Sequence, residues 1–391
     1  MKRFLFALCI CMILAVLASM YGTTFALAEP KMQPIAGVKA AYLTDGDGQV
    51  EMYAYQADTH YPIASMVKIM TALLSVEAVD RGEMTLDETI VISPTAMGMG
   101  GSQMFLNAGD AYKVDDLLKG VVVVSANDAC VALAERLAGS EGAFVAKMND
   151  RAAELGMTNT HFANCTGLPH PEGYSCARDV SVMLRALIGH EVYHRYSNVW
   201  LEDYVHPDGR TTTLTNTNKL VRFYPGCDGG KTGYTAEAGF CLAATATKNG
   251  MRAVSVVIGS ADSKHRFAAS SNLLNYAFAN YRFASLAEVG REIGSAKVRG
   301  GKVETVAVGV ARPLGVLCAV GAKPDATLQL SIDEVRAPVA EGDTVGTATL
   351  VVDGVVADTC PLLALSAVDK GTYGDALREY LEHYPLGSIG K

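Results

Sequence analysis

The apolar positions in the first two thirds of the chain follow two periods. Helical spacing predicts helices from Ser65 to Arg81-Gly82 and in the segments 114–124, 128–138, 144–155, 178–188 and 266–278. Two shorter apolar regions, 38–55 and 240–259, each contain a turn dipeptide typical of β-hairpins. The segment 94–107 has no clear period and is interpreted as irregular surface. The pattern therefore predicts helices combined with antiparallel strands.

Helical spacing disappears between residues 303 and 365. Valines and other apolar residues alternate with small or polar ones at 306–310 and 328–332, and Asp353-Gly354 joins two further valine-rich runs. This alternation predicts a small all-β domain, built as a sandwich, which we place at residues 284–368.

The segment 369–391 is predicted to be a short amphipathic tail. Its apolar residues between 373 and 384 share one helical face, while its acidic residues outnumber Arg378. An acidic face opposes binding to anionic lipid, so peripheral membrane contact and docking on the protein itself are both open.

The N-terminus has the composition of an export signal. Basic residues at positions 2 and 3 precede an apolar run from 4 to 20, and Ala26-Leu27-Ala28 provides a small-x-small cleavage site. We therefore predict a signal peptide at residues 1–28 and an exported, extracytoplasmic protein. A retained membrane span is the alternative, because the apolar run is close to the minimum length for crossing a bilayer.

Composition and charge narrow the possible functions. Half of the residues are hydrophobic and 19% are charged, so a sizeable core is expected, and 391 residues suggest two or three domains. The net charge of −8, without basic clusters, argues against nucleic acid as a partner. Seven of the nine cysteines lie beyond residue 28, and none has the close spacing of a zinc or redox motif. We expect most of them to be buried thiols and leave disulfides open.

The most informative polar residues stand at the start of the first long helix. Ser65 and Lys68 are three positions apart, so a helix places the amine and the hydroxyl on one face. A serine hydroxyl needs a neighbour to take its proton, and a desolvated lysine with a lowered pKa can do so. The alternative is structural, because serine is a common helix cap and this spacing occurs by chance.

Two further polar motifs follow in chain order. Ser125-Ala126-Asn127 separates two apolar helices, which would hold a hydroxyl and an amide at a fixed place. Its alternative is an ordinary turn with Asp128 as a helix cap. Lys231-Thr232-Gly233 precedes the hairpin at 240–259, where glycine allows a substrate backbone to approach and lysine and threonine offer donors to a carboxylate.

In this order, the three motifs resemble those of serine penicillin-recognising enzymes. Around them, the sequence is similar to the low-molecular-weight penicillin-binding proteins that act as D-alanyl-D-alanine carboxypeptidases, serine peptidase family S11. The resemblance covers residues 38–283 well and the rest more loosely. It implies an α/β (α+β) fold at 29–283, of the β-lactamase/transpeptidase type, with a central antiparallel sheet flanked by helices and a small all-β domain after it.

The resemblance also implies a role for each matched residue. Ser65 would be the acylated nucleophile, Lys68 its general base and Ser125 a proton shuttle. Substrate would be bound by Asn127, Lys231, Thr232, Gly233, Thr235 and Arg266. The oxyanion would be held by the N–H of Ser65 and one near Tyr234. The substrate would be the peptidoglycan pentapeptide, β-lactam antibiotics would be covalent inhibitors, and neither a metal nor a cofactor is implied.

Two positions depart from the pattern of the family. Ala126 stands where the family commonly has glycine. Gly230 stands where the family usually has a bulkier apolar residue, and this difference affects the fit of the strand that carries Lys231. Two other functions stay open. A β-lactamase would need a carboxylate-held water, for which no Glu-x-x-x-Asn segment is found between Ser125 and Lys231, and a non-catalytic binder of wall peptides or β-lactams would keep the fold without turnover.

Overall fold

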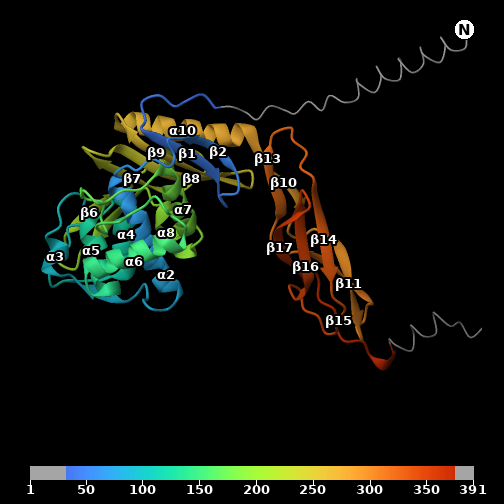
Figure 1. Ribbon diagram of the computed structural model, residues 1–391. Coiled ribbons are helices and arrows are strands. Elements are labelled where there is room, and N and C mark those ends of the chain that lie inside the picture. The colour runs from blue at the N-terminus through green and yellow to red at the C-terminus, as the bar shows by residue number, and fades with distance from the viewer. Residues whose placement is uncertain (1–31, 375–391) are drawn as a thin grey trace, which may run out of the picture.

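The computed structural model describes residues 32–374 (Figure 1). The predicted signal peptide at 1–28 and most of the predicted tail lie outside the described residues. Within the described part of the chain, every helix is too short or too polar to cross a membrane.

A five-stranded antiparallel sheet forms the centre of the first part of the structure. Its strand order is β2-β1-β9-β8-β7. The strands are β1 (Ala40–Asp45), β2 (Glu51–Tyr55), β7 (Cys227–Thr235), β8 (Gly239–Lys248) and β9 (Met251–Ser260). Both predicted hairpins are confirmed, and β7, which carries Lys231, lies at the edge of the sheet. An edge strand keeps one row of backbone groups available to a peptide.

Helices cover both faces of this sheet. On one face, α10 (Ser263–Asn280) packs along β8 and β9 with its small and leucine residues (Figure 1). On the other face lies α7 (Ala177–Ile188), which packs against β1, β9 and the central helix α2 (Lys68–Asp80). These two layers confirm the predicted α/β fold with an antiparallel sheet between helices.

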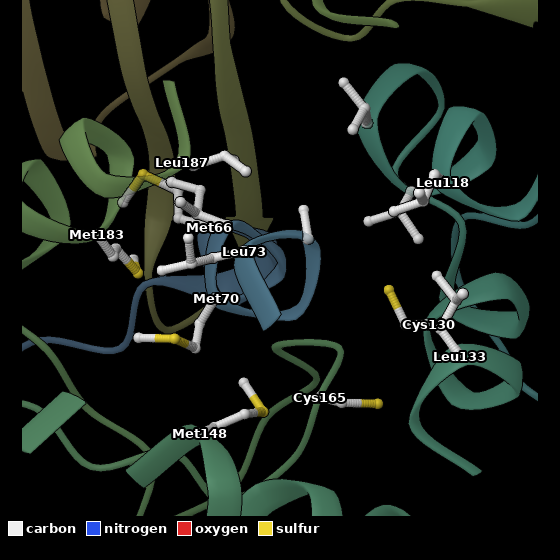
Figure 2. Close-up of a cluster of buried hydrophobic side chains, with 14 of the residues drawn as sticks. Met66, Met70, Leu73, Leu118, Cys130, Leu133, Met148, Cys165, Met183 and Leu187 are labelled. Atoms are coloured by element: carbon white, nitrogen blue, oxygen red, sulfur yellow. The ribbon is translucent and has the colours of Figure 1, made fainter. Parts of the chain in front are cut away.

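Helix α2 is buried on nearly all sides. Met66, Met70 and Leu73 contribute to a core that also contains Met148 and Leu187 from neighbouring segments (Figure 2). The other elements of this part of the structure are η1 (Ala64–Val67), α3 (Pro94–Met97), α4 (Val114–Val123), α5 (Asn127–Ala138), α6 (Glu141–Glu154), α8 (Glu191–Ser197), α9 (Leu220–Phe223), β3 (Thr89–Val91), β4 (Ala111–Lys113), β5 (Leu201–Val205) and β6 (Thr211–Thr215). A buried helix provides a rigid base for the polar groups at its start.

The predicted first helix differs from the structure in its opening turn. Ser65 lies in a 3-10 turn, η1, and the α-helix begins at Lys68. The region 94–107 is also more regular than expected, since Ser93 caps the short helix α3 by accepting from the N–H of Ala96.

The chain continues into a C-terminal β domain. Its strands are β10 (Tyr281–Ala287), β11 (Gly294–Arg299), β12 (Thr305–Val310), β13 (Leu314–Ala319), β14 (Ala326–Ile332), β15 (Val335–Arg336), β16 (Thr344–Val352) and β17 (Val355–Ala364). Six of them form a sheet in the order β14-β16-β17-β12-β11-β15, and β10 pairs with β13. Small and branched side chains such as Val308, Ala348 and Leu362 fill its core.

Candidate active site

Ser65 lies where three segments of the chain meet. Its η1 turn packs against β7 so closely that a Cβ added to Gly233 would lie 3.2 Å from the Ser65 nitrogen. On another side, a Cβ added to Gly167 would lie 2.0 Å from the Ala64 carbonyl oxygen. Glycine at these two positions therefore allows backbone to approach the half-buried serine from both sides.

Lys68 contacts the Ser65 hydroxyl directly. The Nζ–Oγ distance is 2.9 Å, and the same nitrogen donates to the Thr166 carbonyl at 2.5 Å. The Lys68 side chain is fully buried, and this burial lowers its pKa from the ordinary lysine value. A neutral lysine amine beside a serine hydroxyl can accept the hydroxyl proton, so the pair has the geometry of a base and its nucleophile.

A loop that the sequence analysis did not select holds the other side of Lys68. The Asn164 side-chain oxygen accepts from the backbone N–H groups of Thr166 at 3.2 Å and Gly167 at 2.6 Å. These bonds fix the Thr166 carbonyl that receives the lysine. The composition Asn164-Cys165-Thr166-Gly167 predicts a loop, but only the fold places it against Lys68.

Ser125 and Asn127 occupy the turn between α4 and α5. Ser125 has a positive φ of 67°, which is uncommon for a residue other than glycine. The Asn127 side-chain nitrogen donates to the Gly100 carbonyl at 2.6 Å. In the described range 32–374, the buried Ser125 Oγ and Asn127 Oδ1 have no hydrogen-bond partner. Both atoms therefore lack a hydrogen-bond partner that a ligand could supply.

The Asp128 carboxylate binds a neighbouring loop, whereas the sequence suggested that it would cap a helix. Its Oδ1 accepts from the backbone N–H of Met104 at 3.1 Å, and its Oδ2 accepts from that of Leu106 at 3.1 Å. It thereby ties the loop before β4 to the Ser125 turn. A Cβ on Gly101 in that loop would lie 2.8 Å from the Asn127 side-chain nitrogen and 3.9 Å from Leu168. The loop at 98–106 and the loop at 164–168 thus flank the same site.

Lys231 and Thr232 are buried in β7. Burial first, and then the neighbouring charge of Lys68, lowers the pKa of Lys231 well below its ordinary value. Its ammonium donates to the Thr232 carbonyl at 3.2 Å. Farther along the strand, Tyr234 is exposed and Thr235 accepts from the N–H of Ala238 at 3.1 Å. An anion bound beside Lys231 would favour the charged form of its amine, so this part of the site suits an anionic group.

Gly230 fits the structure because it is glycine. Its φ is +127°, and an added Cβ would lie 2.2 Å from the Ala243 carbonyl oxygen. Its N–H leaves the strand ladder and donates to the buried Tyr193 hydroxyl at 2.9 Å. The local conformation of β7, which the bond to Tyr193 supports, therefore requires glycine at position 230.

The Arg266 side chain extends from α10 to the backbone of β7. Its Nη1 donates to the carbonyls of Gly233 at 3.0 Å and Cys241 at 3.2 Å. The guanidinium also lies over the rings of Phe240 and Phe267. These contacts attach it to the strand that carries Lys231. They place Arg266 at the site and also show that it supports the backbone there.

All seven cysteines in the described residues are free thiols. Cys130 and Cys165 are fully buried close to α2 (Figure 2). Burial raises the pKa of Cys130 to about 12, so its thiol stays protonated and unreactive at neutral pH.

The pairing of a serine with a buried lysine defines a class of serine acyl-transfer enzymes that use an amine as the base. Comparison with known families agrees with this class. Residues 28–262 match the family described as D-alanyl-D-alanine carboxypeptidase, peptidase S11, and residues 281–370 match the C-terminal domain of penicillin-binding protein 5. The chain therefore belongs to the S11 family, and it is an enzyme of this class rather than a β-lactamase or a non-catalytic binder.

Individual relatives cover most of the chain. D-alanyl-D-alanine carboxypeptidase DacF of Bacillus subtilis is 38% identical over 338 residues, which span 86% of this chain and 87% of that protein. DacA of Escherichia coli is 32% identical over 334 residues, with 83% and 82% covered.

Solved structures give the same assignment. Penicillin-binding protein 5 of Haemophilus influenzae has a TM-score of 0.65 at 29% identity, covering 87% of this chain and 100% of that one. PBP3 of Streptococcus pneumoniae, described as a peptidoglycan synthesis regulatory factor, has a TM-score of 0.69 at 26% identity, covering 85% and 99%.

Proposed function

We propose that the protein removes the terminal D-alanine from peptidoglycan stem peptides through an acyl-serine intermediate at Ser65. The observation that carries this proposal is the 2.9 Å contact between Ser65 Oγ and the buried amine of Lys68. It is supported by membership of the S11 family.

In the acylation step, Lys68 takes the proton of Ser65 as Oγ attacks the carbonyl carbon of the scissile peptide bond. The C–N bond then breaks, and Ser125 delivers a proton to the leaving nitrogen. The oxyanion is held by the backbone N–H of Ser65 and by one from β7 near Tyr234, a role supported by the close packing of β7 against η1. Water then hydrolyses the ester, releasing the shortened peptide and restoring Ser65.

Substrate recognition uses both ends of the scissile bond. Asn127 binds the amide on the acyl side with its unpartnered side-chain oxygen. Lys231, Thr232 and Thr235 bind the terminal carboxylate, supported by the positive charge of the strand. Arg266 assists at the same carboxylate. Gly233 lets β7 lie close to the η1 turn, which brings the substrate-binding strand beside Ser65.

The cellular setting follows from the same chemistry. Peptidoglycan lies outside the cytoplasmic membrane, so we infer that the protein is exported by the predicted signal peptide at 1–28. β-Lactams imitate the D-Ala-D-Ala end and acylate the same serine. Peripheral contact between the tail and the membrane stays a prediction.

The direct test is the release of D-alanine. Purified protein is incubated with a peptide ending in D-Ala-D-Ala, and free D-alanine is measured with a D-amino acid oxidase assay. We expect steady release by the wild type and none by Ser65→Ala. Release by the variant at the wild-type rate would refute the assignment of the nucleophile, and no release by a folded wild type would refute the proposed reaction.

A further inference from the structure

One buried hydroxyl near the site is left unused by the proposed reaction. Thr217 lies in the turn that follows β6, and its Oγ1 is buried without a hydrogen-bond partner in the described part of the chain. A buried hydroxyl is ordinarily paired, because it loses its bonds to water when it leaves solvent. An unpaired one beside an active site indicates that a ligand completes it.

The turn that carries Thr217 is held rigidly by its two neighbours. The buried Asn216 accepts from the N–H of Asn218 at 2.9 Å and donates to the Val199 carbonyl at 2.8 Å. The fully buried Asn218 accepts from the N–H of Leu220 at 3.1 Å. Because both asparagine side chains are engaged, the Thr217 backbone between them has a fixed position.

Two hydrogen bonds place Thr217 between the proton-shuttle turn and the lysine strand. Its N–H donates to the Val123 carbonyl at 3.1 Å, two residues before Ser125. On the other side, Asn218 donates to the Gly229 carbonyl at 3.1 Å, two residues before Lys231. Both Ser125 and Lys231 serve the leaving-group end of the substrate in the proposed reaction. These bonds therefore place Thr217 at the end of the site where the leaving residue would lie.

The positive charge of this region indicates that Thr217 contacts an anionic group. Lys231 lies on the strand beside it, and the Arg266 guanidinium brings a second positive charge to the same strand. The leaving residue, a terminal D-alanine, has one anionic group, its carboxylate. A hydroxyl donates well to a carboxylate and adds a bond without adding a third charge.

We propose that Thr217 Oγ1 donates a hydrogen bond to the terminal carboxylate of the leaving residue, beside Ser125 and Lys231. This inference rests on the proposed carboxypeptidase function and adds a substrate-binding residue to it. Thr217 thereby helps the enzyme to distinguish a chain end from a peptide bond within a chain.

The test compares two substrates and three variants. Thr217→Val keeps the shape and removes the donor, and Thr217→Ser keeps the donor. Thr215→Val changes an exposed threonine at the end of β6 and is the matched control. We measure kcat/KM on a D-Ala-D-Ala peptide with a free carboxylate and on its C-terminal amide. Melting temperatures confirm that each variant is folded, and Thr217→Ala replaces Thr217→Val if the latter does not fold.

We expect Thr217→Val to lower kcat/KM on the acid about tenfold, the size of one hydrogen bond to a charged group, and to change the amide by less than about twofold. Thr217→Ser should recover most of the loss, and Thr215→Val should behave as the wild type. Equal losses on acid and amide, or no loss on either, would overturn the inference. If the wild type itself does not release D-alanine from the acid, the proposed function fails, which is a different result from failure of Thr217 alone.

Discussion

Replacing Gly233 with alanine tests whether the close approach of β7 to Ser65 is needed for catalysis. The added Cβ would lie 2.7 Å from the Ile63 carbonyl oxygen, 3.2 Å from the Ala64 Cβ and 3.2 Å from the Ser65 nitrogen. Two of these neighbours are backbone atoms, which cannot rotate away as a flexible side chain would. The strand and the η1 turn must therefore move apart.

The distances set the size of the expected effect. Restoring an ordinary carbon–oxygen contact requires a shift of roughly half an ångström or more, and overpacking of this kind costs about 1–3 kcal/mol of stability. A displacement of about 1 Å at reacting atoms lowers a rate about 100-fold. We therefore expect Gly233→Ala to slow acylation about 10- to 100-fold and to lower the melting temperature by several degrees.

The assay is the rate at which a fluorescent penicillin labels the protein. Gly142→Ala is the matched control, because Gly142 lies in α6 with no atom within 4 Å of an added Cβ. The control should label at the wild-type rate and be equally or more stable. If a folded Gly233→Ala labels as fast as the control, the packing of β7 against Ser65 does not position the reacting groups, and this reasoning is wrong.

Three further predictions concern Lys68 and Arg266. Lys68→Ala should slow D-alanine release by about 10²- to 10⁴-fold, the usual contribution of a general base, and a variant that keeps most of its activity at neutral pH would exclude this role. Because burial lowers the pKa of Lys68, the wild-type acylation rate should rise with pH through a midpoint below the ordinary lysine value, and a midpoint at or above that value would contradict the assignment. Arg266→Ala should lower kcat/KM by about tenfold or more on a D-Ala-D-Ala acid and much less on its amide, whereas equal losses would show that its bonds to Gly233 and Cys241 are its whole role.

Local patterns predicted the parts of the fold that depend on neighbouring residues. Turn dipeptides identified the two hairpins of the sheet, and the spacing of Ser65 and Lys68 identified the pair whose atoms lie 2.9 Å apart. A three-residue offset brings two side chains together on either an α-helix or a 3-10 turn, so the error in the type of turn did not affect this prediction.

Contacts between distant segments could not be predicted in the same way. Thr166 meets Lys68 across 98 residues of sequence, and Thr217 meets Val123 across a comparable distance. Their own neighbourhoods indicate only a loop and a turn. The need for glycine at position 230 likewise depends on the Ala243 carbonyl of the adjacent strand, which no local pattern reveals.

The most direct test of the account is the intact mass of the protein during incubation with benzylpenicillin. We predict that the wild type gains the mass of one penicillin and that digestion places the adduct on the peptide containing Ser65. Prior addition of a D-Ala-D-Ala peptide should slow the gain. A folded Ser65→Ala protein should gain nothing. An adduct on another residue, or labelling of Ser65→Ala, would contradict the claim that Ser65 is the acylated nucleophile.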